Sequence, residues 1–295
     1  MQRVEIQAGL DLSRIVYGMW RLADDQDVSA GNIIAKVEAC LEQGITTMDH
    51  ADIYGGYTVE EHFGRALKGA GLRDKIEIVT KCGIVAPTGD YAGARLKHYN
   101  TSAEHISASI DRSLRLLGTD YIDLLLIHRP DPFMDFTETG GALDAAVSSG
   151  KVRAVGVSNF RPWDLAALQS CMQTKLVVNQ IELSLLARDP FTNGDLSSMT
   201  RDKVRAMAWS PLGGGRLFSN DTDLGRTLDR IAAEQGVDRT AIAVAWLLAH
   251  PAHILPVMGT NNVARIRQIG DAMKVKLSRE DWFELYSTAE GRDVP

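Results

Sequence analysis

The stretch YIDLLLIH at residues 121–128 is a short apolar run that ends on a polar residue, His128. A segment with helical spacing, residues 102–117, comes just before it and is closed by Gly118. An apolar run of this length next to a helical segment is typical of a buried strand in a parallel sheet. The stretch therefore predicts a βα unit with His128 at the carboxyl end of its strand.

Seven other short apolar runs have the same character as residues 121–128. All the predicted strands, in chain order, are 14–18, 46–52, 76–83, 121–128, 152–158, 177–183, 204–210 and 254–259. Amphipathic segments between them predict helices at 31–43, 59–67, 102–117, 143–149, 162–171 and 263–273. Eight strands that alternate with helices close a barrel, so we expect an α/β fold of the (β/α)8 TIM-barrel type.

A small hairpin is predicted ahead of the first barrel strand. Val4 and Ile6 alternate with polar neighbours, and Leu12 follows a break at Ala8 and Gly9. Apolar alternation on both sides of a glycine is typical of two paired strands. We expect this hairpin to plug the bottom of the barrel.

A doubly wound dinucleotide-binding sheet is the alternative architecture. It would carry G-x-G-x-x-G after its first strand, but the sequence near Gly18 is YGMWRL, and no P-loop motif occurs elsewhere. The chain also has no Pro/Ser-rich linker and no internal repeat beyond the βα alternation. We therefore expect residues 1–295 to form one domain.

Composition and charge limit the partners of the chain. The formal net charge is −6 and no run of Lys or Arg interrupts the sequence, so nucleic acid is an unexpected partner. The N-terminus MQRVEIQAGL lacks an apolar targeting region, and the longest apolar stretch, 241–249, is too short to span a bilayer. Three cysteines without a C-x-x-C pair favour reduced thiols. These features predict a cytoplasmic protein without a membrane partner.

His250 and His253 form an H-x-x-H pair, which is a spacing that metal sites use. Pro251 interrupts the local helix, and the sequence offers no third ligand nearby. We expect these histidines to be structural or surface residues, and we expect no metal site.

Polar residues at the ends of the predicted strands carry the candidate chemistry. In (β/α)8 barrels the functional side chains lie at the carboxyl ends of the strands. Asp49 and Tyr54 follow the second predicted strand, Lys81 lies in the third, and His128 ends the fourth. Each alone also has a structural explanation, but together they converge on one end of the barrel. Because strand side chains alternate, an inward Lys81 places Cys82 outward as a structural thiol.

These four residues suit the protonation of an oxygen that gains negative charge. A tyrosine hydroxyl has a pKa of about 10, and a nearby ammonium such as that of Lys81 lowers it toward neutrality. Asp49 can keep the buried Lys81 protonated. A neutral His128 can donate a hydrogen bond to a carbonyl oxygen and orient it beside Tyr54. This is the second half of carbonyl reduction by hydride transfer.

Over nearly its whole length the chain resembles the aldo-keto reductase superfamily. The motifs that carry the resemblance are GMW at 18–20, TTMDHADIYGG at 46–56, VTK at 79–81, LLLIH at 124–128, GVSNF at 156–160, NQIE at 179–182, WSPLGGG at 209–215 and PVMGTNNVARI at 256–266. The resemblance implies an oxidoreductase that transfers a hydride between NADP(H) and a carbonyl or alcohol. It implies that Asp49, Tyr54, Lys81 and His128 are the catalytic tetrad, with Tyr54 as general acid.

The same resemblance implies a nicotinamide cofactor held without a dinucleotide fold. Ser158, Asn159 and Gln180 match the residues that bind the nicotinamide amide, and Trp209 matches the ring on which the nicotinamide stacks. The full set of implied cofactor-binding residues is Gly18, Met19, Trp20, Asp49, Ser158, Asn159, Gln180, Trp209, Ser210, Pro211, Leu212, Gly213, Arg216, Gly259, Thr260, Asn261 and Arg265.

The choice between NADP(H) and NAD(H) depends on residues 259–265. Thr260, Asn261 and Arg265 at a predicted strand-to-helix junction suit the adenosine 2′-phosphate, through backbone donors, the helix dipole and a guanidinium. We expect NADP(H) to be preferred. Some relatives carry a lysine where Gly259 stands here, so NAD(H) is retained as a second cofactor.

Two other functions stay open at this point, together with the identity of the substrate. Lys81 could form a Schiff base, as in aldolases, or the chain could be a regulatory module like the β subunits of potassium channels. We expect a small carbonyl substrate and a monomer or small homo-oligomer. The longest loops, 83–101 with Tyr91, His98 and Tyr99, and 129–137 with Phe133 and Phe136, predict an apolar pocket. Arg129 could attract an anionic group or serve as a surface ion-pair partner.

Overall fold

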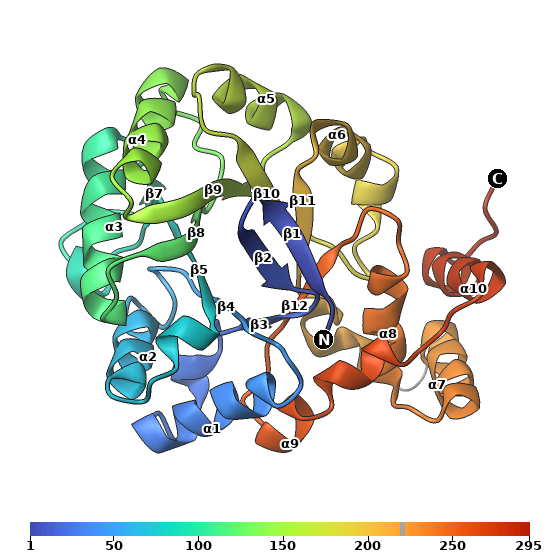
Figure 1. The fold of residues 1–295 in the computed structure, drawn as a ribbon. Helices are drawn as coiled ribbons and strands as arrows, with labels where there is room; N and C mark the ends of the chain where they lie inside the picture. Colours follow the sequence, from blue (N-terminus) through green and yellow to red (C-terminus); the bar gives the residue numbers. More distant parts are fainter. Residues whose placement is uncertain (219–221) are drawn as a thin grey trace.

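The computed structural model describes residues 1–218 and 222–295. Its centre is a closed barrel of parallel strands in the order β10, β11, β12, β3, β4, β5, β8 and β9, seen down its axis in Figure 1. These strands are β3 Val16–Gly18, β4 Thr47–Asp49, β5 Glu77–Cys82, β8 Ile122–Ile127, β9 Val152–Ser158, β10 Leu176–Glu182, β11 Arg205–Trp209 and β12 Leu255–Met258. Each of the eight predicted strands contains or overlaps one of them, so the (β/α)8 expectation is confirmed.

The helices surround the barrel on its outer side (Figure 1). They are α1 Ala30–Leu41, α2 Val59–Leu67, α3 Ala103–Leu117, α4 Phe136–Ser148, α5 Pro162–Ser170, α6 Asp195–Asp202, α7 Asp223–Gln235, α8 Arg239–Leu248, α9 Val263–Ile266 and α10 Arg279–Glu290. The start and stop signals act as expected. Ser102 accepts a hydrogen bond from the His105 N–H at the start of α3, and Gly118 ends that helix at φ 65°.

Two predicted helices differ from the structure. The segment 143–149 is the second half of α4, which already begins at Phe136 because Asp135 caps its first turn. The segment 263–273 is divided into the short helix α9 and a separate 3-10 turn at Ile269–Met273. The apolar stretch 241–249 lies mainly in α8, whose residues from Ala241 to Leu247 are all buried. A helix that is apolar on every side is expected to lie within the protein core.

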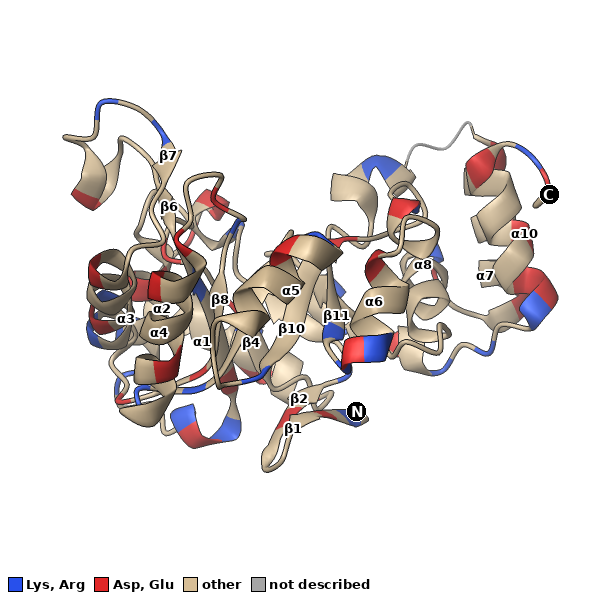
Figure 2. Ribbon diagram, turned by 90° about the horizontal axis from the view of Figure 1, so that it is seen from above, with Lys and Arg blue, Asp and Glu red and all other residues tan. Residues whose placement is uncertain are grey.

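The N-terminal hairpin is present and covers one end of the barrel. It consists of β1 Arg3–Gln7 and β2 Leu10–Ser13, paired antiparallel. Val4, Ile6, Leu10 and Leu12 pack with the inward-facing residues of the barrel, among them Leu124. Figure 2 shows β1 and β2 at one end of the barrel, with β6 Ile84–Val85 and β7 His98–Tyr99 at the other. The hairpin closes the amino end of the strands, which leaves the carboxyl end for ligands.

Helix α10 is held by an aromatic cluster. The rings of Trp246 and Trp282 stack at 4.9 Å, and each indole N–H donates to the backbone carbonyl of the other residue at 3.0 Å. Phe191 packs edge-on against both rings. Within the described ranges, no helix has the length and apolar character needed to cross a bilayer.

Candidate active site

The four residues of the predicted tetrad meet at the carboxyl end of the barrel. Asp49 is the last residue of β4, Lys81 is near the end of β5, and His128 directly follows β8. The neighbouring strands β4, β5 and β8 therefore bring three of the side chains together. Tyr54 comes from the loop after β4, whose Asp52 N–H donates to the Lys81 carbonyl at 3.0 Å.

Lys81 is the centre of this group and is fully buried. Its ammonium donates to both carboxylate oxygens of Asp49 at 2.9 Å, to the His50 carbonyl at 2.6 Å and to the Tyr54 hydroxyl at 2.9 Å. An ammonium has three N–H groups, and here all of them are engaged. Burial alone lowers the pKa of Lys81, but the charge of Asp49 and the hydrogen bond to Tyr54 outweigh it and raise the pKa. A protonated, enclosed amine does not favour the Schiff-base alternative, which needs a free neutral lysine.

The Tyr54 hydroxyl lies deep beside Lys81, although part of the ring is exposed at the mouth. Burial raises the pKa of Tyr54 above its ordinary value of 10.0, and the charge and hydrogen bond of Lys81 lower it only in part. The expectation of a net downward shift is therefore wrong, because the loss of hydration outweighs the nearby cation. The hydroxyl holds its proton at neutral pH and is available as a donor.

His128 is neutral, as the sequence analysis required. Burial, with the charges of Lys81 and Arg129, holds the pKa of His128 well below 6.5. Its Nδ1 is buried and has no hydrogen-bond partner among residues 1–218 and 222–295. A proton on that nitrogen would lack an acceptor, so we assign the proton of the neutral ring to Nε2. The ring lies edge-on to the Tyr54 ring, with 6.1 Å between the two ring centroids.

The residues implied for the nicotinamide amide form a hydrogen-bonded chain beside the tetrad. The Asn159 amide donates to the Ser158 hydroxyl at 2.8 Å and to the His128 carbonyl at 3.3 Å, and it accepts from the Trp209 indole N–H at 2.9 Å. Asn159 has φ 63°, a left-handed conformation that asparagine tolerates better than most residues. The Gln180 amide donates to Asp49 Oδ1 at 2.8 Å. Sequence reasoning missed this last contact, which joins the amide-binding group to the Asp49–Lys81 pair.

The loop after β11 is a tight turn with several positive φ angles. Ser210 has φ 50°, and Gly213, Gly214 and Gly215 have φ 59°, 68° and 98°. The Gly213 and Gly215 N–H groups donate to the Ser210 and Leu212 carbonyls at 2.8 and 3.0 Å, which closes a tight turn. A Cβ on Gly214 or Gly215 would meet no atom within 4 Å, so the space above them is open. Arg216 is exposed and is anchored through Nε to the Gly213 carbonyl at 3.0 Å. Pro211 and Leu212 belong to the same turn.

The loop after β12 is held by residues that the sequence analysis did not name. The buried Tyr17 hydroxyl donates to the Thr260 carbonyl at 2.7 Å, and Asn262 caps α9 by accepting from the Arg265 N–H. Asn261 donates to the Arg21 carbonyl at 2.6 Å. The expected helix dipole is weak here, because α9 is a single short turn and few peptide dipoles align. The Arg265 side chain has no hydrogen bond or ion pair with the part of the chain that is described.

The GMW motif at the end of β3 lies between these loops. Gly18 packs against β12, where a Cβ would lie 2.9 Å from the Val257 side chain, so any larger residue would push the two strands apart. Met19 is buried, and Trp20 is 61% exposed. Gly259 is exposed at the end of β12, with the Gly18 carbonyl 3.6 Å from the position of a Cβ. Of these four residues, Trp20 is the one with a large exposed side chain.

The expected apolar pocket is not supported by the long loops. Tyr91 packs on Tyr57 and His105, and Phe136 packs against the outer core. Phe133 is 98% exposed, and His98 in β7 is also exposed. Tyr99 is partly buried in the same two-stranded pairing with β6. Aromatic composition did not predict the pocket, because an aromatic side chain in a loop can pack against the outer helices as readily as it can line the mouth of the barrel.

The remaining candidate features lie outside this site. Cys82 is buried against the outer core, and burial raises the pKa of its thiol well above 9.0, which agrees with a structural thiol. His250 packs on Phe191 and Trp282, and across residues 1–218 and 222–295 no group of three His, Cys, Asp or Glu could hold a metal ion.

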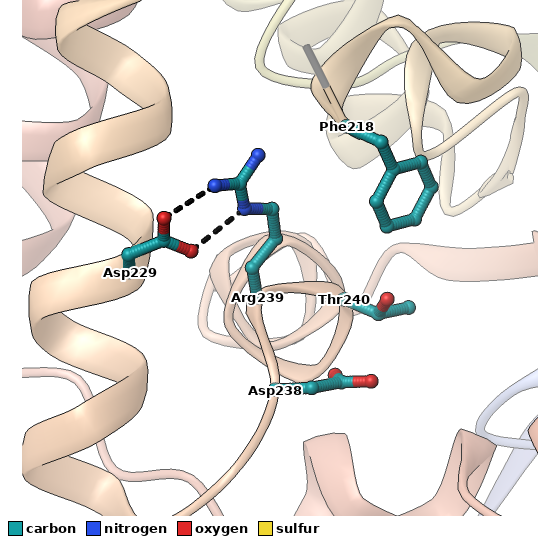
Figure 3. A pocket seen from close by; sticks show the side chains of 5 residues that line it. All are labelled: Phe218, Asp229, Asp238, Arg239 and Thr240. Atoms are coloured by element: carbon teal, nitrogen blue, oxygen red, sulfur yellow. Dashed lines mark hydrogen bonds and ion pairs between the residues drawn. The ribbon is translucent and has the colours of Figure 1, made fainter. Parts of the chain in front are cut away.

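A hollow of about 380 Å³ lies outside the barrel, between α7 and α8 (Figure 3). It is lined by Phe218, Asp229, Asp238, Arg239 and Thr240, none of them a predicted site residue.

His50 is a second histidine at the site that sequence reasoning passed over. It is fully buried beside Asp49, and its ring centroid lies 4.4 Å from that of Phe63. Neither ring nitrogen has a hydrogen-bond partner in the described part of the chain. Burial, with a smaller effect of Lys81, lowers the pKa of His50 from 6.5 to about 3. The signal in the sequence was its place in DHAD between two carboxylates, but only the packing shows that the ring turns away from them onto α2.

We expect His50 to make the protein less stable in acid. In the unfolded chain His50 takes up a proton near pH 6.5, whereas in the folded protein it stays neutral down to about pH 3. The free energy of unfolding therefore decreases as the pH falls below 6.5. The loss is about 1.4 kcal/mol per pH unit, or about 2 kcal/mol between pH 6.5 and 5. Urea unfolding of wild type and His50→Phe at the two pH values measures it. The exposed His98→Gln is the control, and an unchanged pH dependence in His50→Phe would contradict the assignment.

The barrel and the cluster at its mouth define a class of protein, a (β/α)8 oxidoreductase that acts on carbonyl or alcohol groups. The chain belongs to the aldo/keto reductase family, whose model matches residues 14–290. It is 63% identical over 298 residues to a 6-dehydroglucose reductase of Agrobacterium fabrum, with 100% of both chains covered.

Solved structures of the family are similar to this chain over almost its whole length. A thermostable aldo-keto reductase in complex with the inhibitor epalrestat superposes with a TM-score of 0.85 at 30% identity, covering 98% of this chain and 100% of that one. An aldo/keto reductase from Klebsiella pneumoniae, in complex with NADP and acetate, has a TM-score of 0.78 at 26% identity, covering 94% and 92%.

Proposed function

We propose that this protein is an NADPH-dependent reductase of a polyhydroxylated aldehyde, with 6-dehydroglucose as the leading candidate. The observation that carries the reaction type is Lys81, whose ammonium joins Asp49 and Tyr54 at 2.9 Å beside a neutral His128. The candidate substrate rests on the Agrobacterium fabrum relative, at 63% identity over the whole chain. By its name that substrate is glucose oxidised at C6, so its reduction there yields glucose.

The proposed chemistry assigns one role to each member of the tetrad. Tyr54 donates its proton to the carbonyl oxygen as negative charge develops there. His128 donates a hydrogen bond from Nε2 to the same oxygen and orients it. Lys81 stabilises the phenolate that remains on Tyr54, and Asp49 keeps Lys81 charged. When bound, the reduced nicotinamide supplies the hydride to the carbonyl carbon.

The site residues fit NADP(H) in three places. Ser158, Asn159 and Gln180 would hold the nicotinamide amide, and Trp209 would supply a ring for stacking. The open backbone at Gly214 and Gly215, together with Arg216, would take the pyrophosphate. Thr260, Asn261 and the unpaired Arg265 would take the 2′-phosphate. We propose further that residues 1–295 act as one domain, and the three free thiols support a reducing compartment such as the cytoplasm.

The test is a direct assay of NADPH oxidation with 6-dehydroglucose and with simple aldehydes and ketones, with glucose formation as the product readout. Turnover of 6-dehydroglucose with the highest kcat/KM supports the proposal. If the protein reduces other carbonyls but not 6-dehydroglucose, the proposed substrate is wrong and the proposed reaction stands. Tight NADPH binding without turnover of any carbonyl would favour the regulatory role instead.

We expect Arg265→Ala to narrow the preference for NADPH over NADH. A guanidinium hydrogen-bonded to phosphate is a charge-assisted contact, so its loss should weaken NADPH binding by about 10-fold or more and leave NADH nearly unchanged. Fluorescence titration of both cofactors on wild type and variant measures the ratio. The exposed Arg267→Ala, whose partner Glu42 lies away from the loop, is the matched control. Equal losses for the two cofactors would remove Arg265 from the 2′-phosphate site.

A further inference from the structure

Arg129 is a charged residue of the mouth to which the proposed mechanism gives no role. It follows His128 directly, is partly buried, and has no hydrogen bond or ion pair with residues 1–218 or 222–295. Withdrawing a charge from water without a hydrogen bond or an ion pair costs free energy, which a cation–π contact with Trp209 offsets only in part. Other arginines that are partly buried here do have partners, as Arg73 does with Asp123 at 2.9 Å.

The side chain of Arg129 extends over the mouth instead of away from it. It starts at the end of β8, yet its guanidinium lies 5.9 Å from the ring centroid of Trp209 at the end of β11. In the barrel order these two strands are separated by β9 and β10. The chain of hydrogen bonds from the His128 carbonyl through Asn159 to Trp209 spans the same interval. The guanidinium therefore lies over the opening that His128 and Trp209 border.

This position separates Arg129 from the loop after β12, which is proposed to bind the 2′-phosphate. The 2′-phosphate loop follows β12, and in the barrel order β8 lies directly opposite β12. A side chain at the end of β8 that leans toward Trp209 borders the place where a carbonyl must lie to reach Tyr54 and His128. The electrostatic pattern agrees with this position. Burial lowers the pKa of His128 and Arg129 adds to that effect, whereas burial raises the pKa of Tyr54 and Arg129 offsets a small part of the rise.

We propose that Arg129 is a specificity-determining residue that hydrogen-bonds the hydroxyl oxygens of a polyhydroxylated aldehyde, an inference that rests on the proposed function. The five N–H donors of a guanidinium lie in one plane and can contact two neighbouring oxygens at once. Vicinal hydroxyls next to an aldehyde present such a pair of oxygens. The aromatic side chains of the neighbouring loops do not compete for this place, because Phe133 is exposed and Phe136 packs outward.

The test compares matched aldehydes in the full-length enzyme with NADPH. D-Glyceraldehyde and propanal share a three-carbon skeleton and differ in two hydroxyl groups. Succinic semialdehyde and butanal share a four-carbon skeleton and differ in a carboxylate, so they test for recognition of an anion. For Arg129→Leu we expect the ratio of kcat/KM for glyceraldehyde over propanal to fall roughly 10- to 100-fold, mainly through KM. Arg129→Lys keeps the positive charge but lacks the planar guanidinium. Its kcat/KM ratio for glyceraldehyde over propanal should therefore lie between those of the wild type and Arg129→Leu. The exposed Arg95→Leu, on the β6–β7 loop, should keep the wild-type ratio.

Each other outcome overturns a defined part of the argument. If the ratio is unchanged in Arg129→Leu while the wild type reduces both aldehydes, the inference fails and the proposed function stands. If kcat/KM falls equally for glyceraldehyde and propanal in Arg129→Leu, Arg129 acts through Tyr54 or His128 and not on the substrate. If only the succinic semialdehyde ratio falls, the guanidinium recognises an anion. If the wild type reduces no carbonyl, the proposed function and the inference fail together. A thermal unfolding scan of each variant shows whether it is folded.

Discussion

Tyr54→Phe is expected to lower kcat for carbonyl reduction by about 10²–10⁴-fold, the usual contribution of a general acid. The substitution keeps the ring at the mouth and removes only the hydroxyl, which lies 2.9 Å from the Lys81 ammonium. Lys81 retains Asp49 and the His50 carbonyl as partners, so the fold and NADPH affinity should change little. Stopped-flow measurement of hydride transfer, with deuterated NADPH to establish the slow step, gives the effect on chemistry.

The matched control is Tyr57→Phe, three residues further along the same loop. Its hydroxyl is buried outside the tetrad and bonds the Ile84 carbonyl at 3.0 Å. That variant should lose some stability but keep the rate of hydride transfer. The general-acid role of Tyr54 is untenable if Tyr54→Phe keeps more than about a third of the wild-type rate where hydride transfer limits turnover.

Lys81→Met is expected to have the largest combined effect on stability and activity. It removes the cation from a buried pair and leaves the Asp49 carboxylate with the Gln180 amide as its only donor among the described residues. Breaking a buried pair from one side typically costs about 3–5 kcal/mol of unfolding free energy. Hydride transfer should slow as well, because the phenolate of Tyr54 loses its charge partner, so adding Tyr54→Phe should slow it little further.

A double variant separates the charge from the loss of packing. In Asp49→Asn/Lys81→Met the uncompensated carboxylate is gone, while an amide oxygen remains for Gln180. We expect it to be more stable than Lys81→Met by about 2 kcal/mol in urea unfolding, although both stay inactive. If the double variant is less stable than Lys81→Met, the unpaired Asp49 carboxylate is not the cause of the stability loss in Lys81→Met.

Much of the fold was accessible from the sequence because parallel barrel strands are buried on both faces. Runs such as residues 121–128 are therefore mostly apolar, and each run marked its strand to within a few residues. The positions of Asp49, Lys81 and His128 followed from the same pattern, since each stands where an apolar run gives way to a polar residue. The helices were placed less well where their caps were polar turns, as at Asp135, because such turns resemble loops.

Tertiary structure alone decided how these residues interact. The contact from Gln180 to Asp49 joins residues 131 positions apart, and the approach of Arg129 to Trp209 crosses the mouth of the barrel. The net pKa shift of Tyr54 is upward because the depth of its hydroxyl outweighs the nearby Lys81, and a sequence does not contain that depth. Local patterns record which residues prefer to be buried and where a strand ends. Distances across the barrel and the loss of water at each group arise only when the strands close, and those quantities set the charges on which the chemistry depends.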